Sequence, residues 1–105
     1  MVIRQFDVFP NPSTMSRATV PYVVILQSEY AGELQTSIVA PLYRSDAADL
    51  LTHVTVDVRF EEQDLVASIP ELAAINNRSL RKKAGTAITY EDELRRALDR
   101  LFTGF

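Results

Sequence analysis

The amino-acid sequence predicts a mainly β protein of the α+β class: a small antiparallel barrel or sheet with one packed C-terminal helix. Several short stretches within residues 2–69 are continuously apolar or alternate between apolar and polar residues, as strands do. Proline residues and polar clusters separate these stretches. Residues 89–105 repeat their apolar residues at a helical period instead, so one helix follows a β-rich region.

Five strands are expected, at residues 2–9, 21–27, 34–42, 54–60 and 65–69. The stretch 21–27 is apolar without alternation, which suits a strand covered on both faces, by the helix on one side and by a partner on the other. Val54, Val56, Val58 and Phe60 alternate with polar residues, so that strand is expected to be half-buried.

The segments between these strands predict turns and loops. Residues 10–19 contain two prolines and are expected to form a loop, and residues 31–33 and 61–64 are expected to form turns. Residues 45–51 predict a loop with at most one helical turn. Residues 71–75 follow Pro70 and predict a short helical turn.

The last segment predicts one amphipathic helix with a single apolar stripe. The stripe consists of Tyr90, Leu94, Ala97, Leu98, Leu101 and Phe102. Thr89 stands where an N-cap hydroxyl belongs, and Gly104 fits the position just past a helix end. Glu91 with Arg95, and Asp92 with Arg96, are acid-before-base pairs one turn apart. The end of this helix is therefore either packed like the rest, or followed by a free tail that carries an aromatic ring and the terminal carboxylate.

Length and composition indicate a single domain covering residues 1–105. The chain is 47% hydrophobic and 24% charged, as ordinary globular proteins are. A chain this short builds only a small core, so we expect an oligomer to add buried surface. The net charge of -3 and pI near 5.0 argue against a broad basic face that binds nucleic acid without a partner.

The N-terminal residues and the lengths of the apolar runs indicate where the protein is located in the cell. The N-terminal residues 1–7 mix charged with apolar side chains and do not resemble a signal peptide. No apolar run approaches the roughly 20 residues that span a bilayer. We therefore expect a cytoplasmic protein without membrane contact.

Residues that could carry catalysis are few. The sequence has no cysteine, and no metal-ligand spacing or Ser–His–Asp order can be assembled around its only histidine, His53. Glu61, Glu62 and Asp64 are candidates for a carboxylate site, but a short polar run between two strands is more often a solvated hairpin turn. We expect no metal, no cofactor and no catalytic residue.

A basic patch is the one other candidate site. It comprises Arg78, Arg81, Lys82 and Lys83. Such a patch either keeps a loop soluble or binds an acidic peptide. Together with the lack of catalytic groups, it indicates a non-enzymatic interaction domain.

Five stretches in order carry a family resemblance. They are Arg4-Gln5-Phe6-Asp7-Val8-Phe9, Tyr22-Val23-Val24-Ile25-Leu26-Gln27-Ser28-Glu29, Ile38-Val39-Ala40-Pro41-Leu42, Glu71-Leu72-Ala73-Ala74-Ile75, and Ala97-Leu98-Asp99-Arg100-Leu101-Phe102-Thr103-Gly104-Phe105. Together they resemble the CcdB family of plasmid and chromosomal toxins that poison DNA gyrase. The Gln-Ser-acid ending of the second stretch, the Pro-Leu pair and the final hydrophobic-x-Gly-hydrophobic pattern make the resemblance specific.

The resemblance implies an SH3-like barrel with a C-terminal helix, assembled as a two-fold homodimer. Family members insert the ends of their paired helices into the gyrase A dimer of DNA gyrase and trap the enzyme while it holds cleaved DNA. A CcdA-like antitoxin neutralises them through a flexible segment. The toxin–antitoxin complex represses its own operon, so operator DNA is expected as a partner of the complex only.

The resemblance also implies which residues act. The gyrase-binding tail corresponds to Thr103, Gly104 and Phe105, where the best-known family pattern has Trp, Gly and Ile. The antitoxin is expected to contact the loop at residues 10–19 and the basic residues Arg78, Arg81, Lys82 and Lys83. A homodimer would also cover the apolar stretch 21–27.

Two alternatives remain open. The MazF/Kid group of RNA endonuclease toxins has the same barrel, and residues 21–27 and 38–41 resemble its strands. That group carries a Gly-Glu-Gln-x-Gly-x-Arg-Pro type loop, which residues 16–21 lack. The other alternative is a non-toxic binding module on the same fold. Toxicity on expression separates that module from both toxins, and RNA cleavage separates the two toxins.

Overall fold

The structure is a computed structural model that describes residues 2–29, 34–50 and 54–104. Its regular elements are one antiparallel sheet of seven strands and one α-helix, α1 (Glu91–Thr103). The strands are β1 (Asp7–Pro10), β2 (Tyr22–Ile25), β3 (Thr36–Arg44), β4 (Thr55–Phe60), β5 (Gln63–Ser68), β6 (Ala73–Asn76) and β7 (Gly85–Thr86). The 3-10 turns are η2 (Ser45–Leu50), η3 (Ile69–Glu71), η4 (Asn77–Ser79) and η5 (Ile88–Tyr90). The predicted class, mainly β with a C-terminal helix, is confirmed.

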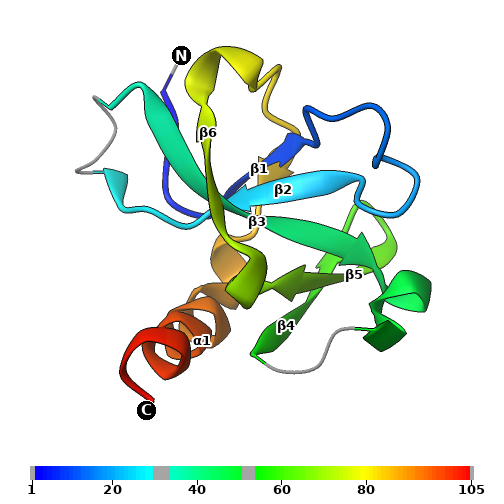
Figure 1. Ribbon diagram of the computed structural model, residues 1–105, viewed down its shortest axis with the longest axis vertical. Helices are drawn as coiled ribbons and strands as arrows, with labels where there is room; N and C mark the ends of the chain where they lie inside the picture. The colour runs from blue at the N-terminus through cyan, green and yellow to red at the C-terminus, as the bar shows by residue number, and fades with distance from the viewer. Residues whose placement is uncertain (1, 30–33, 51–53, 105) are drawn as a thin grey trace.

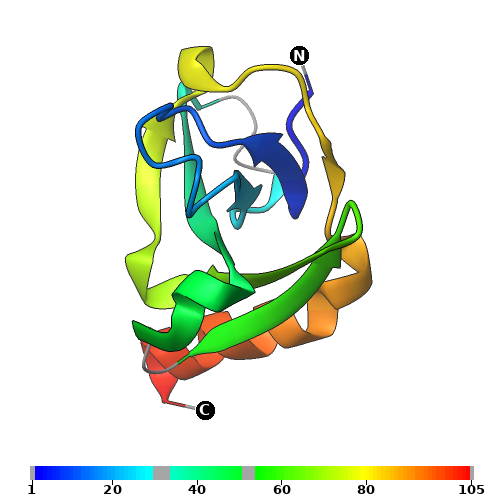
Figure 2. The same ribbon diagram turned by 90° about the vertical axis from the view of Figure 1, so that its right-hand side faces the viewer.

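The sheet curls around its longest strand, β3. The strand order is β4-β5-β3-β2-β1-β7, and β6 pairs with β3 beside this path. The start of β3 pairs with β6, in a register that sets Thr36 opposite Asn76, and its end pairs with β5, where Leu42 is opposite Ala67. Because β3 has different partners at its two ends, the sheet bends into a half-barrel (Figure 1). Helix α1 lies across the end formed by β4 and β5 (Figure 2).

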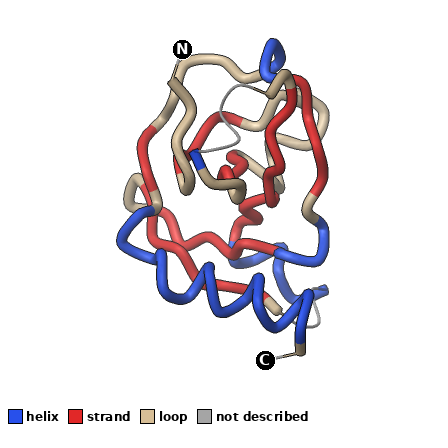
Figure 3. Tube along the Cα trace, turned by 90° about the vertical axis from the view of Figure 1, so that its left-hand side faces the viewer, coloured by secondary structure: helices blue, strands red, loops and turns tan. Residues whose placement is uncertain are grey.

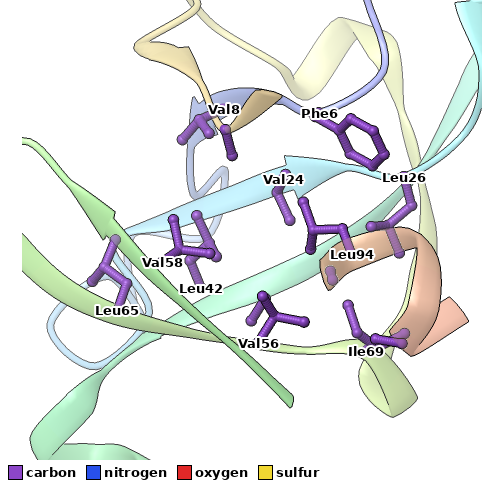
Figure 4. Packing of buried hydrophobic residues seen from close by; sticks show 14 of the residues in the cluster. Phe6, Val8, Val24, Leu26, Leu42, Val56, Val58, Leu65, Ile69 and Leu94 are labelled. Carbon is purple, nitrogen blue, oxygen red and sulfur yellow. The ribbon is translucent and has the colours of Figure 1, made fainter. Parts of the chain in front are cut away.

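The main core lies between the curled sheet and α1. Leu94 of the helix is fully buried and points at Val24 of β2, at Leu26 just after β2, and at Val56 of β4 (Figure 4). Along β4, burial alternates strictly, with Val56, Val58 and Phe60 inside. The half-buried strand predicted from this alternation is therefore confirmed. Burial of so many large apolar side chains is the main force that holds the helix against the sheet.

Strand β2 is buried on both faces, as its continuous apolar sequence predicted. Val24 and Leu26 belong to the core beneath the helix. Val23 and Ile25 belong to a second cluster on the other face, formed with Phe9, Val39 and Leu80 and flanked by the partly buried Ile3 and Ile75. The expectation that a partner chain covers this second face is wrong, because the chain itself covers it.

Several element boundaries differ from the prediction; the strands predicted at residues 21–27, 34–42 and 65–69 are β2, β3 and β5, whose ends are shifted by one or two residues. Strand β1 begins at Asp7 instead of residue 2, because the Asp7 N–H donates to Arg4 O and Phe6 takes a left-handed φ of 70°, which makes a turn. The helical turn expected at residues 71–75 is wrong. Its residues 73–75 belong to β6, and the helical turn is η3, one step earlier, with Pro70 in its first turn. The sequence predicts a loop with at most one helical turn at residues 45–51, whereas residues 45–50 form the 3-10 helix η2, which is about two turns long.

The start and end of the C-terminal helix also need correction. Thr89 is not the N-cap, because residues 88–90 form η5 and the α-helix begins after Tyr90. The hydroxyl that accepts a hydrogen bond at this entry is that of Thr86, from the Ile88 N–H at 3.1 Å. Phe102 belongs to the predicted apolar stripe, but its side chain is exposed instead of packed. The Glu91–Arg95 pair is formed at 2.8 Å, whereas Asp92–Arg96 is not among the ion pairs of the described residues.

The turn expected at residues 31–33, the histidine His53 and the terminal Phe105 lie outside the described residues. Within the described ranges, no helix is long and apolar enough to cross a membrane.

Candidate functional site

The C-terminal end of α1 stands free of the barrel. Leu94 and Ala97, in the middle of the helix, are buried in the core. Phe102 is 68% exposed, and Thr103 and Gly104 are exposed as well. Figure 3 shows the helix running along the end of the half-barrel, with the chain leaving at its far end. The helix therefore anchors through its middle and presents its last residues to solvent.

Gly104 ends the helix in a conformation that suits glycine. Its φ of 82° is left-handed, and its N–H donates to Arg100 O at 3.1 Å, as in the common C-cap. A Cβ at this position would meet nothing within 4 Å, so backbone conformation, not crowding, explains the glycine. The Thr103 hydroxyl donates to Asp99 O at 2.6 Å and is thus directed back along the helix. The predicted position of Gly104, just past the helix end, is confirmed.

An apolar groove lies beside this helix end. It has a volume of about 300 Å³ and is lined by Leu26, Gln27, Ile38, Leu72, Leu98 and Phe102. Next to Leu72 the chain continues into β6, where Ala73 and Ala74 are exposed. Among the described strands, β6 pairs only with β3, so its other edge is open. We call the groove residues together with β6 the apolar face.

The four basic residues lie at the opposite end of the molecule from the helix end (Figures 1 and 2). Arg78, Arg81, Lys82 and Lys83 are all exposed. Lys83 has a structural contact, because its Nζ lies 3.5 Å from the carboxylate of Asp7, which is only 4% exposed. The structure therefore does not bring the basic patch and the tail together.

The loop after β1 is held by its own polar contacts. Asn11 is buried, and its Nδ2 donates to Val20 O at 2.8 Å and to the Ser16 hydroxyl at 2.9 Å. Arg17 closes the loop by donating from Nε to Asn11 O at 2.8 Å. Met15, at 96% exposure, is the most exposed large apolar side chain of the described residues. These hydrogen bonds give the loop expected at residues 10–19 a defined conformation.

The hairpin turn predicted at residues 61–64 is present but shorter, because Gln63 and Asp64 already belong to β5. Glu61 and Glu62 both have left-handed φ values, 51° and 61°, in the two-residue turn between β4 and β5. Asp64 accepts from the Arg59 guanidinium at 2.7 Å.

Elsewhere on the sheet, a hydrogen bond to the carboxylate of Glu71, together with burial, raises the pKa of Tyr43 to about 12. The Tyr43 hydroxyl is therefore protonated at neutral pH and donates to Glu71 at 2.7 Å.

The fold and the exposed helix end agree with a comparison to protein families. The model of the family described as CcdB protein matches residues 5–104 of this 105-residue chain. The chain belongs to the CcdB family. A comparison with curated protein sequences gave no match. Membership in the CcdB family supports, in general, a toxin of a toxin–antitoxin system that poisons DNA gyrase, a family of inhibitors and not of catalysts.

Sequence reasoning found part of this surface and missed part. It singled out Thr103 and Gly104, which the structure places together at the free helix end, while the third tail residue, Phe105, lies outside the described residues. It missed Phe102, because the helical period assigns that residue to the same stripe as Leu94. No sequence signal separates Phe102 from Leu98 and Leu101 of the same stripe, which pack partly against the core.

Proposed function

We propose that this chain is the toxin of a type II toxin–antitoxin system and that its tail, Thr103, Gly104 and Phe105, binds the gyrase A dimer of DNA gyrase. In this proposal the bound tail traps gyrase while the enzyme holds cleaved DNA. The observation that carries the proposal is the free end of α1, anchored by Leu94 and open around Gly104.

The geometry supports recognition by insertion. A helix that is fixed in its middle presents its end in one orientation, which lowers the entropy lost on binding. Aromatic side chains that enter a partner's pocket are frequent energetic centres of interfaces, and Phe105 is the aromatic residue of the proposed tail. Thr103 stands where the best-known pattern has Trp, so Phe105 supplies the aromatic surface of this tail.

A homodimer would present two such tails, and the apolar face is its best-supported interface. The groove with Leu72, Leu98 and Phe102 is almost wholly apolar, and the open edge of β6 continues it. Contiguous exposed apolar surface of this kind marks interaction sites on small proteins. Two-fold pairing on this face would bring both helix ends to the same side of the assembly.

Light scattering tests the homodimer. We expect a dimer at micromolar concentration, and we expect Leu72→Asp to give a folded monomer because it places a charge in the middle of the interface. Met15→Asp is the control for an added charge, since Met15 is almost fully exposed and is not one of the residues of the apolar face. A monomeric wild-type chain would contradict the proposal, as would a Leu72→Asp variant that remains dimeric.

An acidic, disordered segment of a CcdA-like antitoxin is the proposed neutralising partner. Opposite charge favours its encounter with Arg78, Arg81 and Lys82, whose side chains form no ion pair within the described residues. These residues lie far from the tail, so a segment bound there must be long to cover the tail as well. Operator DNA is proposed as a partner of the toxin–antitoxin complex only, because the chain alone is acidic.

Charge reversal of Arg78, Arg81 and Lys82 to Glu tests this contact. We expect weaker antitoxin binding with a smaller dependence on salt concentration. Lys83 is left in place because of its contact with Asp7. Unchanged affinity and unchanged salt dependence would remove the basic patch from the antitoxin site.

Gyrase assays with the purified chain test the function itself. We expect inhibition of supercoiling and accumulation of gyrase-linked cleaved DNA, with no cleavage of RNA. RNA cleavage without an effect on gyrase would favour the endonuclease alternative. Absence of both activities, together with non-toxic expression, would favour a binding module.

A further inference from the structure

The outer edge of β4 carries backbone groups without partners in the described part of the chain. The two-residue turn sets Phe60 opposite Gln63 as a hydrogen-bonded pair, and such pairs alternate along an antiparallel ladder. Val58 and Val56 therefore bond to β5, whereas Thr55, Asp57 and Arg59 direct their N–H and C=O groups outward. The hydrogen bond from the Ile69 N–H to Val54 O at 3.3 Å agrees with this alternation, because Val54 is the next residue expected to bond toward β5.

One of these outward groups already has a partner, and it shows how the helix lies. The Arg59 N–H donates to the Tyr90 hydroxyl at 2.9 Å, so the start of α1 lies beside the end of β4. The two elements then run antiparallel, as Figures 2 and 3 show. The N–H groups of Thr55 and Asp57 are left as donors toward the space beside the helix.

That space is a groove of about 390 Å³ between strand and helix. It is lined by Val54, Thr55, Val56, Asp57, Tyr90, Glu93, Arg96, Ala97 and Arg100. One wall is thus an open strand edge, and the other is a helical surface with two guanidinium groups. Neither Arg96 nor Arg100 takes part in an ion pair of the described residues. Glu93 is the acidic residue of the helical wall, and Asp57 extends from the exposed face of β4.

The spacing of the two arginines matches an extended chain. Residues four apart in a helix are separated by about 6 Å along the axis. Alternate residues of a strand, which point to the same side, are separated by about 6.7 Å. A peptide that adds to the edge of β4 therefore can place two alternate side chains opposite Arg96 and Arg100.

We infer that this groove binds an extended peptide segment of a protein partner, which adds as a strand to β4 and has acidic residues at two alternate positions. Its backbone pairs with Thr55 and Asp57, and its carboxylates pair with Arg96 and Arg100. Binding of this kind takes affinity from main-chain hydrogen bonds and specificity from alternate side chains. The inference does not depend on gyrase as the target, because the groove and the apolar face lie on different sides of α1.

A blocked peptide of alternating Thr and Glu, seven residues long by design, is the probe for this groove. Titrated into the full ¹⁵N-labelled chain, it is expected to shift the amide signals of Thr55 and Asp57 and to slow their hydrogen exchange. Arg96→Glu with Arg100→Glu is expected to weaken binding by about tenfold or more, since two attractive pairs become repulsive. Asp57→Pro is expected to abolish binding: it removes an outward N–H and spares the ladder to β5.

Two control peptides separate main-chain pairing from simple charge attraction. A Thr–Lys peptide is expected not to bind, and a Thr–Glu peptide with methylated backbone nitrogens is expected to lose binding, because it cannot donate to the edge. The second control keeps the test decisive even if Asp57→Pro does not fold. Equal binding of the methylated peptide, or shifts that map away from β4, would overturn the inference. So would an Asp57→Pro variant that dissociates a homodimer, because the edge would then belong to a second copy.

Discussion

Replacing Leu94 by Ala tests whether the middle of α1 anchors the helix. Leu94 is fully buried beside Val24, Leu26 and Val56, so the truncation leaves a cavity in the main core. Leu-to-Ala changes at such sites cost about 3 kcal/mol or more. For a domain of this size, that loss lowers the melting temperature by roughly 15 °C. The loss is expected at every protein concentration, because the contacts lie within one chain.

Phe102→Ala is the matched comparison, because sequence periodicity places both residues on one stripe. Phe102 is 68% exposed, so its truncation is expected to change the stability of the isolated chain by less than about 0.5 kcal/mol. If the apolar face pairs two chains, the melting temperature of wild type rises with protein concentration, and that of Phe102→Ala does not. Thermal unfolding of both variants over a range of protein concentrations measures the loss of stability and its dependence on concentration. A loss below about 1 kcal/mol for Leu94→Ala, or equal losses for both, would refute the division into anchor and exposed end.

Three further predictions concern the barrel. Glu61→Asn with Glu62→Gly is expected to stabilise the chain by about 1 kcal/mol in urea unfolding, because these residues suit the left-handed turn better than two Glu do; a loss of stability would show that the turn is not of this type. Tyr43 has its pKa raised to about 12 from an ordinary value near 10.0, so the stability that its neutral form contributes is present below about pH 10 and is lost as the pH rises toward 12. Denaturant unfolding between these pH values is expected to show a smaller decline for Tyr43→Phe, and an identical decline would contradict the assignment. Gly85→Ala is expected to cost about 1–3 kcal/mol, because its Cβ would lie 2.8 Å from the Phe60 ring; a melting temperature equal to wild type would show that the ring moves freely.

The sequence predicted those elements whose signal lies within a few neighbouring residues. Val56, Val58 and Phe60 follow the period of a strand with one buried face, and β4 has that burial. The predicted C-terminal helix is present as α1. In each case neighbouring residues supply the signal, so no knowledge of distant contacts is needed.

The errors come from contacts between distant residues. Residues 73–75 have no strand signal of their own, and they are extended because they pair with Ser37, Ile38 and Val39 of β3. The second face of β2 was predicted to meet a partner, but Leu80, more than fifty positions further on, helps to cover it. The candidate site shows the same limit. Gly104 is recognisable as a helix end, whereas the exposure of Phe102 depends on how distant segments pack against α1, where Leu98 and Leu101 contact the core and Phe102 does not.

The central claim is that the tail beyond the helix carries the contact with gyrase. A chain shortened by Gly104 and Phe105 tests it, compared with wild type for melting temperature, oligomeric state, antitoxin binding and gyrase-linked DNA cleavage. The tail follows the anchored part of α1, so we expect folding, assembly and antitoxin binding to persist while gyrase poisoning and toxicity disappear. A shortened chain that folds and still poisons gyrase would contradict the claim, and one that unfolds would show that the tail belongs to the core.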